Sequence, residues 1–233
     1  MRTYAVVVAG GSGKRMGTAV PKQFLPLGGE PVLARTLEVL ERTDIIDAVV
    51  VAVPKDHVEF TRTEIVEKFS LKKVETVCAG GERRQDSVWA GLKSIKPPCD
   101  VVAIHDGVRP LVTPEIITKS VLVARNFGAA LVAHPVRSTV KVISDDGFVV
   151  STPERRTLVS AQTPQTFDYN LILTAYRKAI ESDFRATDDS QIAEHAGARI
   201  VIVQGETENL KITTETDLEM AELIFQRRSR AGT

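Results

Sequence analysis

The chain has 233 residues, enough for one α/β domain with a large core or for two small domains. Hydrophobic residues make up 43% and charged residues 26%, as in an ordinary globular protein, and the formal net charge is zero. A neutral chain gives no electrostatic reason to expect a nucleic acid or a membrane surface as partner. Any important cations must therefore act locally, on a small anionic ligand.

Cysteine and histidine spacing argues against a zinc site and a disulfide framework. Cys78 and Cys99 form no C-x-x-C pair, and the four histidines form no H-x-x-x-H pair. No apolar run reaches the length of a membrane span, and a strand is expected so close to the first residue that no signal peptide fits. We therefore expect a cytoplasmic protein.

Short apolar runs alternate with amphipathic stretches along the whole chain. Strands are expected over residues 4–9, 48–53, 74–78, 101–105, 129–134 and 199–203. Helices are expected over residues 31–42, 56–69, 86–95, 114–126, 170–182, 188–195 and 215–227. The first four strands are β-branched and nearly continuous, which is typical of strands buried on both faces. The pattern predicts an α/β fold with a doubly wound, mostly parallel, Rossmann-like sheet, and ligands at the carboxyl ends of its strands.

A glycine-rich loop follows the first strand. Gly10, Gly11 and Gly13 let backbone N–H groups approach an anion, and Arg15 and Lys22 would neutralise its charge. The spacing fits neither a Walker A loop nor the G-x-G-x-x-G fingerprint of dinucleotide-binding folds. The alternative is a strand-to-helix turn with solvated cations, but this number of cations favours a nucleoside triphosphate site.

Two further segments bring polar residues to the carboxyl ends of strands. Asp106 and Arg109 follow the fourth strand and offer a carboxylate for Mg²⁺ and a cation for a substrate phosphate, although a local ion pair is the plainer alternative. Residues 80–87 follow the third strand and open a helix. There Asp86 or Ser87 could simply be the helix cap.

Residues 138–158 interrupt the alternation of strands and helices. Asp146 and Gly147 lie between two β-branched runs, which predicts a β-hairpin. Because an isolated two-stranded hairpin is marginal in water, we expect residues 137–158 to form an arm that packs on a second copy of the chain, giving a homodimer. The alternative is a hairpin folded onto the chain's own sheet. No repeat or linker divides the chain, so a single domain over residues 1–233 is expected.

The motifs together resemble the cytidylyltransferases that act on polyol phosphates. The resemblance rests on the glycine loop with Pro21-Lys22, on His105-Asp106-x-x-Arg109-Pro110, on Arg155-x-x-Leu158-x-x-x-Gln162-Thr163-Pro164-Gln165, and on Asn209-Leu210-Lys211-Ile212-Thr213 with Asp217-Leu218 after it. These matches run from residue 5 to residue 218 and are closest to the 2-C-methyl-D-erythritol 4-phosphate cytidylyltransferase family. The resemblance implies a fold of the nucleotide-diphospho-sugar transferase type. It also implies Mg²⁺-dependent transfer of CMP from CTP to methylerythritol phosphate, with release of pyrophosphate, in isoprenoid precursor synthesis.

The resemblance also assigns roles to residues. The nucleotide would be bound by Ala9, Gly10, Gly11, Gly13, Arg15, Lys22, Gly81, Glu82 and Ser87, with Arg84 as support. The acceptor would be bound by Asp106, Arg109, Thr139, Arg155, Thr163 and Lys211, with Thr139 and Arg155 reaching it from the arm. The catalytic residues would be Arg15, Lys22, Asp106 and Lys211, and Asp106 would help to hold Mg²⁺. The attacking phosphate monoester is mostly dianionic at neutral pH, because its second pKa is about 6, so no general base is needed to activate it. One departure is Gly10, where many members of the family carry alanine.

Two alternatives remain open from the residues alone. A ribitol-5-phosphate cytidylyltransferase would share the glycine loop and the late motifs, and would differ only in the acceptor pocket. A non-catalytic nucleotide-binding subunit is the second alternative. The joint presence of Arg15, Lys22, Asp106 and Lys211 argues against it, because a protein that only binds could lose any of them.

Overall fold

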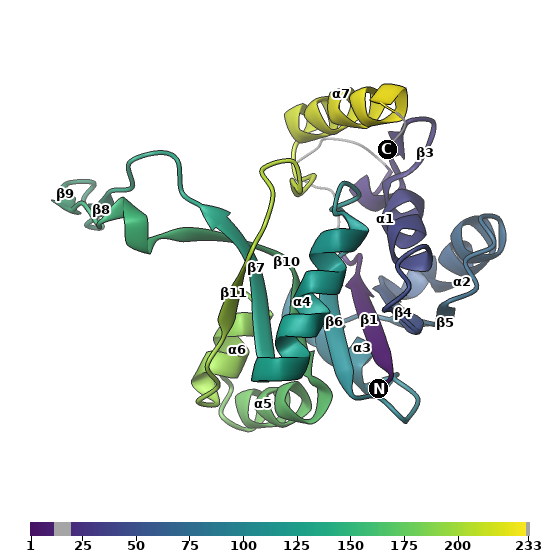
Figure 1. The fold of residues 1–233 in the computed structure, drawn as a ribbon, viewed down its shortest axis with the longest axis horizontal. Coiled ribbons are helices and arrows are strands. Elements are labelled where there is room, and N and C mark those ends of the chain that lie inside the picture. The colour runs from purple at the N-terminus through teal and green to yellow at the C-terminus, as the bar shows by residue number, and fades with distance from the viewer. Residues whose placement is uncertain (12–19, 232–233) are drawn as a thin grey trace.

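A seven-stranded sheet forms the centre of the part of the chain described by the computed structural model, residues 1–11 and 20–231 (Figure 1). Its strands are β1 (Thr3–Val8), β4 (Ala48–Val53), β5 (Val74–Ala79), β6 (Val101–Asp106), β7 (Ala129–Pro135), β10 (Val159–Asp168) and β11 (Val201–Gln204). They lie in the order β11-β7-β10-β6-β1-β4-β5, and β10 is antiparallel to both of its neighbours while the other pairs are parallel. The predicted α/β fold with a mostly parallel sheet is confirmed.

Helices cover both faces of this sheet. One face packs against α1 (Val32–Glu41), α4 (Pro114–Phe127) and the helical segment that includes α2 (Val58–Phe60). The other face packs against α3 (Arg84–Lys93), α5 (Tyr169–Glu181) and α6 (Asp189–His195). Because successive strand residues point to opposite faces, β1 sends alternate side chains into the two apolar layers. This explains why the strands are apolar without alternation.

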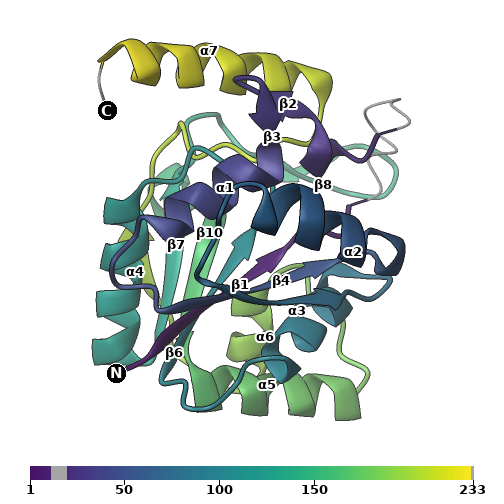
Figure 2. The same ribbon diagram turned by 90° about the vertical axis from the view of Figure 1, so that its right-hand side faces the viewer.

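The last helix closes the carboxyl edge of the sheet. Helix α7 (Glu215–Ala231) lies across this edge, beside the small strands β2 (Pro26–Leu27) and β3 (Glu30–Pro31) (Figure 2). A third apolar cluster lies beneath it and includes Leu27, Val32, Ile212 and Ala221. Arg228 of α7 also donates to the backbone oxygen of Leu111 at 2.9 Å, so the helix is tied to the segment that follows β6.

The predicted hairpin projects from the body as an arm (Figure 1). Strands β8 (Val142–Ile143) and β9 (Val149–Ser151) form a separate two-stranded sheet, and Gly147 at the turn has a φ of +86°. Ile143, Phe148 and Val150 are each more than 60% exposed. The alternative of a hairpin folded onto the chain's own sheet is therefore wrong.

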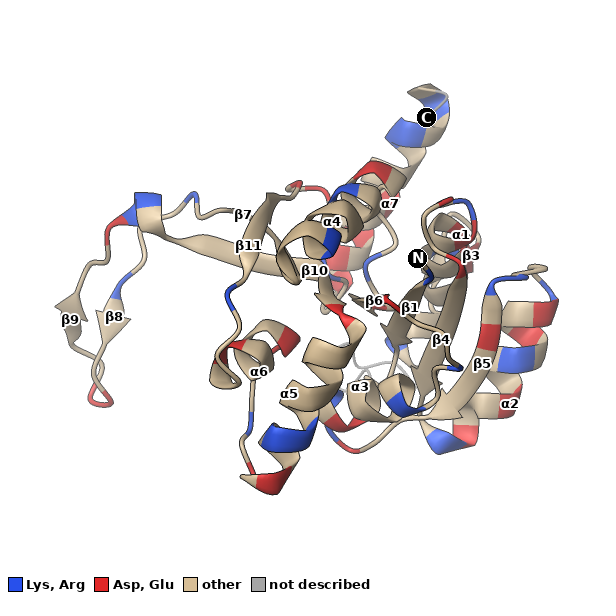
Figure 3. Ribbon diagram, turned by 60° about the horizontal axis from the view of Figure 1, so that its bottom comes forward, with Lys and Arg blue, Asp and Glu red and all other residues tan. Residues whose placement is uncertain are grey.

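The outer helices carry basic and acidic residues interspersed (Figure 3). Among the described residues, no helix is both long enough and apolar enough to cross a membrane. Charged side chains also line the hollows at the carboxyl edge of the sheet, where a small ligand could contact them.

Candidate active site

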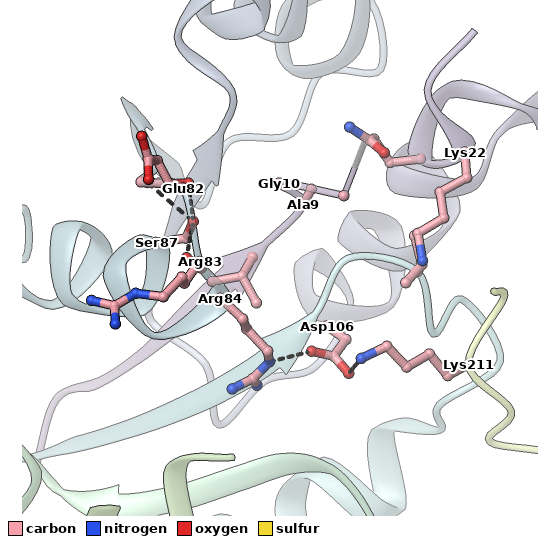
Figure 4. Close-up of a pocket in the computed structure, with 14 residues that line it drawn as sticks. Ala9, Gly10, Lys22, Glu82, Arg83, Arg84, Ser87, Asp106 and Lys211 are labelled. Carbon is pink, nitrogen blue, oxygen red and sulfur yellow. Dashed lines mark hydrogen bonds and ion pairs between the residues drawn. The ribbon is translucent and has the colours of Figure 1, made fainter. Parts of the chain in front are cut away.

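Gly10, Gly11 and Asp106 come together because the strands that precede them are neighbours. Strands β1 and β6 are parallel and pair Val8 with Asp106 at their carboxyl ends. A hollow of about 380 Å³ opens at this edge. It is lined by Val8, Ala9, Gly10, Gly11, Lys22, Gln23, Gly81, Glu82, Arg83, Arg84, Ser87, Asp106, Val108 and Lys211 (Figure 4). Residues from four distant parts of the sequence thus share one polar hollow.

Two glycines pack closely against side chains that line this hollow. A Cβ atom on Gly80 would lie 2.7 Å from Oγ and 3.1 Å from Cβ of Ser87, so this bend leaves no room for a larger residue. A Cβ atom on Gly11 would lie 2.9 Å from Cε of Lys22, whose flexible end could move aside. Lys22 is largely buried, and its Nζ donates to the backbone oxygen of Ile212 at 3.2 Å.

The start of α3 forms another wall of this hollow. The helix begins at Arg84 and its N-cap residue is Arg83, and Asp86 caps the helix from its first turn as the other half of a capping box, so the prediction of a cap is confirmed for Asp86. Asp86 lies inside the first turn and accepts from the backbone N–H of Arg83 at 3.2 Å. The Ser87 hydroxyl accepts from the backbone N–H of Gly81 at 3.2 Å, which fixes the bend before the helix. The positive end of the helix therefore faces the hollow, where it favours an anion.

Asp106 lies at the centre of a cluster of cations (Figure 4). Its Oδ1 is 3.0 Å from Nε of Arg84, and its Oδ2 is 2.9 Å from Nζ of Lys211 and 3.5 Å from Nε of Arg109. Burial opposes ionisation of this carboxyl group, but the charges of Arg84, Lys211 and Arg109 outweigh burial and hold its pKa far below the ordinary value. Asp106 is therefore ionised at neutral pH, and positive charge is left over for an anionic ligand.

A second hollow, of about 260 Å³, lies on the other side of Asp106. It is lined by Arg84, Asp106, Arg109, Ala161, Gln162, Thr163, Gln165, Thr187, Asp188 and Lys211. Three of these residues, Arg84, Asp106 and Lys211, also line the first hollow. The two hollows thus meet at a shared wall made of one carboxylate and two cations.

His105 is buried next to this wall and is neutral. Burial lowers the pKa of His105 to about 4. Its Nδ1 is 2.9 Å from the hydroxyl of Thr163, which also accepts from the backbone N–H of Asp106 at 3.1 Å. Because the backbone oxygen of Arg109 can only accept, neutral His105 donates its Nε2–H to that oxygen at 3.3 Å, and its Nδ1 therefore accepts from the Thr163 hydroxyl. Thr163 was predicted only to bind the acceptor substrate. Its hydroxyl also fixes the backbone at Asp106.

Asp189 is a further residue of this cluster that the sequence did not predict. It is fully buried, and its Oδ2 is 2.8 Å from Nη2 of Arg84. The hydroxyl of Tyr176 donates to Oδ1 of Asp189 at 2.6 Å. Arg84 thus bridges Asp189 and Asp106. The only sequence signal was a helix start at Asp188, which suggests a cap rather than a partner for an arginine.

Asn209 anchors the other side of the cluster. Nη1 of Arg109 donates to its backbone oxygen at 2.7 Å, and Nδ2 of Asn209 donates to the backbone oxygen of Thr163 at 2.9 Å. Asn209 belongs to a motif of the family resemblance, but nothing in the local sequence indicates this bracing role. The bracing holds Arg109 and Thr163 at the second hollow.

Most of the predicted site residues lie together. The first hollow holds Ala9, Gly10, Gly11, Lys22, Gly81, Glu82, Ser87, Asp106 and Lys211, and Arg109 and Thr163 line the second. Thr139 and Arg155 lie on the exposed arm and line neither hollow of their own chain, and Nη1 of Arg155 donates to the backbone oxygen of Arg137 at 3.0 Å. Gly13 and Arg15 lie outside the described residues.

Comparison with known proteins places the chain in a family. The family model described as 2-C-methyl-D-erythritol 4-phosphate cytidylyltransferase matches residues 3–227. The chain belongs to this family. It is 44% identical over 231 residues to the 2-C-methyl-D-erythritol 4-phosphate cytidylyltransferase of Geobacter metallireducens, covering 98% of this chain and 99% of the relative. It is 43% identical over 227 residues to that of Alkaliphilus oremlandii, covering 97% and 96%.

A solved structure of the same family has the same fold. The crystal structure of 4-diphosphocytidyl-2C-methyl-D-erythritol synthase from Anaerococcus prevotii matches with a TM-score of 0.85 and 35% identity. That match covers 97% of this chain and 96% of the other. Because the cytidylyltransferase family model extends from residue 3 to residue 227, it includes both hollows, the arm and most of α7.

Proposed function

We propose that the chain transfers CMP from CTP to the phosphate of 2-C-methyl-D-erythritol 4-phosphate, giving 4-diphosphocytidyl-2-C-methylerythritol and pyrophosphate in isoprenoid precursor synthesis. The observation that carries this proposal is the pair of hollows that meet at Asp106, Arg84 and Lys211. The family membership and the names of the relatives support methylerythritol phosphate rather than ribitol 5-phosphate as the acceptor.

In the proposed reaction, CTP occupies the first hollow and the acceptor phosphate the second. An oxygen of the acceptor phosphate forms a bond to the α-phosphorus of CTP, and the bond from that phosphorus to the bridging oxygen breaks as pyrophosphate leaves. The attacking phosphate is already largely dianionic, so the side chains need not remove a proton. Their task is to reduce repulsion between two anions and to stabilise the charge that develops on the oxygens of the transferred phosphate.

We assign roles to the cations by their position. Lys22, and Arg15 by family resemblance, would bind the phosphates of CTP and stabilise the transition state. Lys211 and Arg109 would bind the acceptor phosphate, because they border the second hollow and are fixed by Asp106. Asp106 would act by orienting these cations. Gly81, Glu82 and Ser87 would position the base through the bend before α3.

The residues fit a Mg²⁺ ion that arrives with the triphosphate. Within residues 1–11 and 20–231, no group of three or more histidine, cysteine, aspartate or glutamate side chains is placed to hold a metal. Oδ1 of Asp106 accepts one hydrogen bond, from Arg84, which leaves a lone pair on this oxygen for a metal ion. Asp106 would therefore supply one protein ligand, and phosphate oxygens and water would supply the rest. When bound, the ion would neutralise charge on the triphosphate and on the leaving pyrophosphate.

We further propose that the enzyme works as a homodimer through the arm. The exposed apolar side chains of residues 142–150 support a protein partner, and Thr139 and Arg155 would then reach the acceptor site of the partner subunit. A cytoplasmic location also stays a prediction, supported by the two unpaired cysteines.

The test measures pyrophosphate release by the purified protein with Mg²⁺, with and without methylerythritol phosphate as acceptor. The nucleotide is CTP, and UTP or ATP replaces it in parallel reactions. We expect release with CTP that depends on the acceptor. Binding of CTP without turnover would instead support a non-catalytic nucleotide-binding subunit.

A further inference from the structure

Gln23 lies in the short 3-10 turn formed by Lys22–Phe24 and lines the first hollow. Its side chain is fully buried. Within the part of the chain that the structure describes, neither Nε2 nor Oε1 of Gln23 has a hydrogen-bond partner. A glutamine amide can donate two hydrogen bonds and accept two, so this side chain leaves its whole hydrogen-bonding capacity unused.

Two other buried glutamine amides near the site have hydrogen-bond partners. Nε2 of Gln165 donates to Asp188 at 2.9 Å, and its Oε1 accepts from the backbone N–H of Ser190 at 2.8 Å. Nε2 of Gln162 donates to the backbone oxygen of Glu206 at 2.7 Å. The fold thus provides partners for these amides but not for Gln23, although buried polar groups without partners are rare and destabilising.

The position of Gln23 indicates which kind of ligand forms hydrogen bonds with its amide. It adjoins Lys22 in the same turn, and both residues line the hollow that is also lined by Gly10, Gly11 and the start of α3. A nucleoside triphosphate offers the hydrogen-bond partners that this amide lacks. Its phosphate and ribose oxygens accept hydrogen bonds, and its hydroxyl groups donate them. An apolar core residue would fill the same space without the cost of an unsatisfied amide.

We propose that Gln23 is a further nucleotide-binding residue, whose amide forms its hydrogen bonds with the bound nucleoside triphosphate. This inference rests on the proposed assignment of the first hollow to CTP. It has an unusual consequence, because the same side chain destabilises the nucleotide-free protein and strengthens nucleotide binding.

The test is Gln23→Met, which keeps an unbranched side chain of similar length and removes the amide. The Kd for CTP is measured by titration calorimetry, and the Tm is measured without nucleotide. We expect CTP binding to weaken on the order of tenfold, which corresponds to the loss of one or two hydrogen bonds to a charged ligand. We expect the Tm of the nucleotide-free protein to stay the same or to rise by about 2–4 °C.

Gln85→Met is the matched control. Nε2 of Gln85 donates to the backbone oxygen of Phe184 at 3.1 Å, its Oε1 accepts from the backbone N–H of Ala186 at 3.2 Å, and the residue does not line the hollow. This variant should lower the Tm and leave the Kd for CTP unchanged. Gln23→Leu repeats the test with a second apolar side chain in case methionine packs poorly.

Unchanged CTP binding in both Gln23 variants would overturn the inference. So would a clear fall in the Tm of both nucleotide-free variants, because that would show an internal partner for the amide. These outcomes differ from a failure of the proposed function, in which the wild-type protein itself would not bind CTP.

Discussion

Asp106 and its neighbours show how single residues set the chemistry of the site. The carboxylate does not stand alone, since Arg84 and Lys211 each lie within about 3 Å of its oxygens. Its charge therefore fixes two cations at the shared wall of the hollows, where the two phosphate groups of the proposed reaction must meet. Lys22 lies in the first hollow beside Gly11, where its charge would contact the triphosphate of CTP in the proposed reaction.

Lys22→Ala should lower kcat by at least a hundredfold, which corresponds to about 3 kcal/mol of lost transition-state stabilisation. The reason is the loss of a charge-assisted contact in a mostly buried position. Steady-state kinetics with both substrates measures the effect. Lys178→Ala, an exposed lysine of α5, is the control and should behave like wild type. A Lys22→Ala variant that keeps most of its kcat would exclude Lys22 from catalysis.

His105 makes stability depend on pH. Its pKa is about 4 in the folded protein, because of burial, and 6.5 in the unfolded chain. Between these values the unfolded chain binds a proton that the folded protein does not, so the free energy of unfolding falls as the pH is lowered from 6.5 to 4. The full loss is about 3 kcal/mol. The low pKa of Asp106 acts in a separate range, below its ordinary value of 3.8.

Urea unfolding at several pH values measures this dependence. His105→Gln should be less stable at neutral pH and should lose most of the slope between pH 6.5 and pH 4. An equal slope in wild type and variant would show that His105 does not remain neutral in the folded protein.

At the scale of elements, the sheet and the helices on its two faces deliver the site residues. Helix α3 brings Arg84 from one side, α6 begins at Asp189 beneath it, and the segment before α7 brings Lys211 from the other side. Arg228 of α7 contacts Glu208 and the backbone oxygen of Leu111. The helix over the carboxyl edge thus holds two of the segments near the second hollow, the one after β6 and the one before α7.

Asp189→Asn should lower the free energy of unfolding by about 2 kcal/mol, because Arg84 then keeps only Asp106 as a charged partner in a buried site. Tyr176→Phe removes only the hydroxyl that donates to Asp189 and should cost about 1 kcal/mol. Urea unfolding compares the two variants. If Asp189→Asn were as stable as wild type, Asp189 would not anchor Arg84.

The sequence correctly predicted the strands that have a clear local pattern of apolar, β-branched residues. The β-branched runs of β1, β4 and β6 are strands as expected, and the glycine loop and Asp106 lie at their ends. Strand β10 was not predicted, because Pro164 and polar residues are unusual in a central strand. The structure accommodates them with an irregular register between Ala161 and Gln165. The contact of Asp189 with Arg84 spans more than 100 residues and could not be read from local sequence.

At the scale of the whole molecule, the arm is the feature that one chain leaves unexplained. Its apolar side chains are exposed, and Thr139 and Arg155 line neither hollow of their own chain. A second subunit would cover the apolar residues and give these polar residues a site to reach. The family resemblance assigns Thr139 and Arg155 to the binding of the acceptor substrate. An arm that reaches the partner subunit would explain both the exposed apolar side chains and the absence of these two residues from the hollows of their own chain.

Arg155→Ala should raise the KM for methylerythritol phosphate by at least tenfold and leave the KM for CTP nearly unchanged, since it removes one cation from the acceptor site only. Co-expression of Arg155→Ala with Lys22→Ala then tests which subunit the residue serves. A mixed dimer has one intact site if Arg155 acts on the partner subunit, and activity should return. Without any recovery in the mixed dimer, Arg155 would act within its own chain or not at the acceptor.

The most direct test of the central claim is a competition between two acceptors, followed by ³¹P NMR of the products. The protein is given CTP and Mg²⁺ with equal amounts of methylerythritol phosphate and ribitol 5-phosphate. We predict a diphosphate diester formed from methylerythritol phosphate alone, with one pyrophosphate released for each product molecule. Formation of the ribitol product, or of neither product while CTP is bound, would contradict the proposed function.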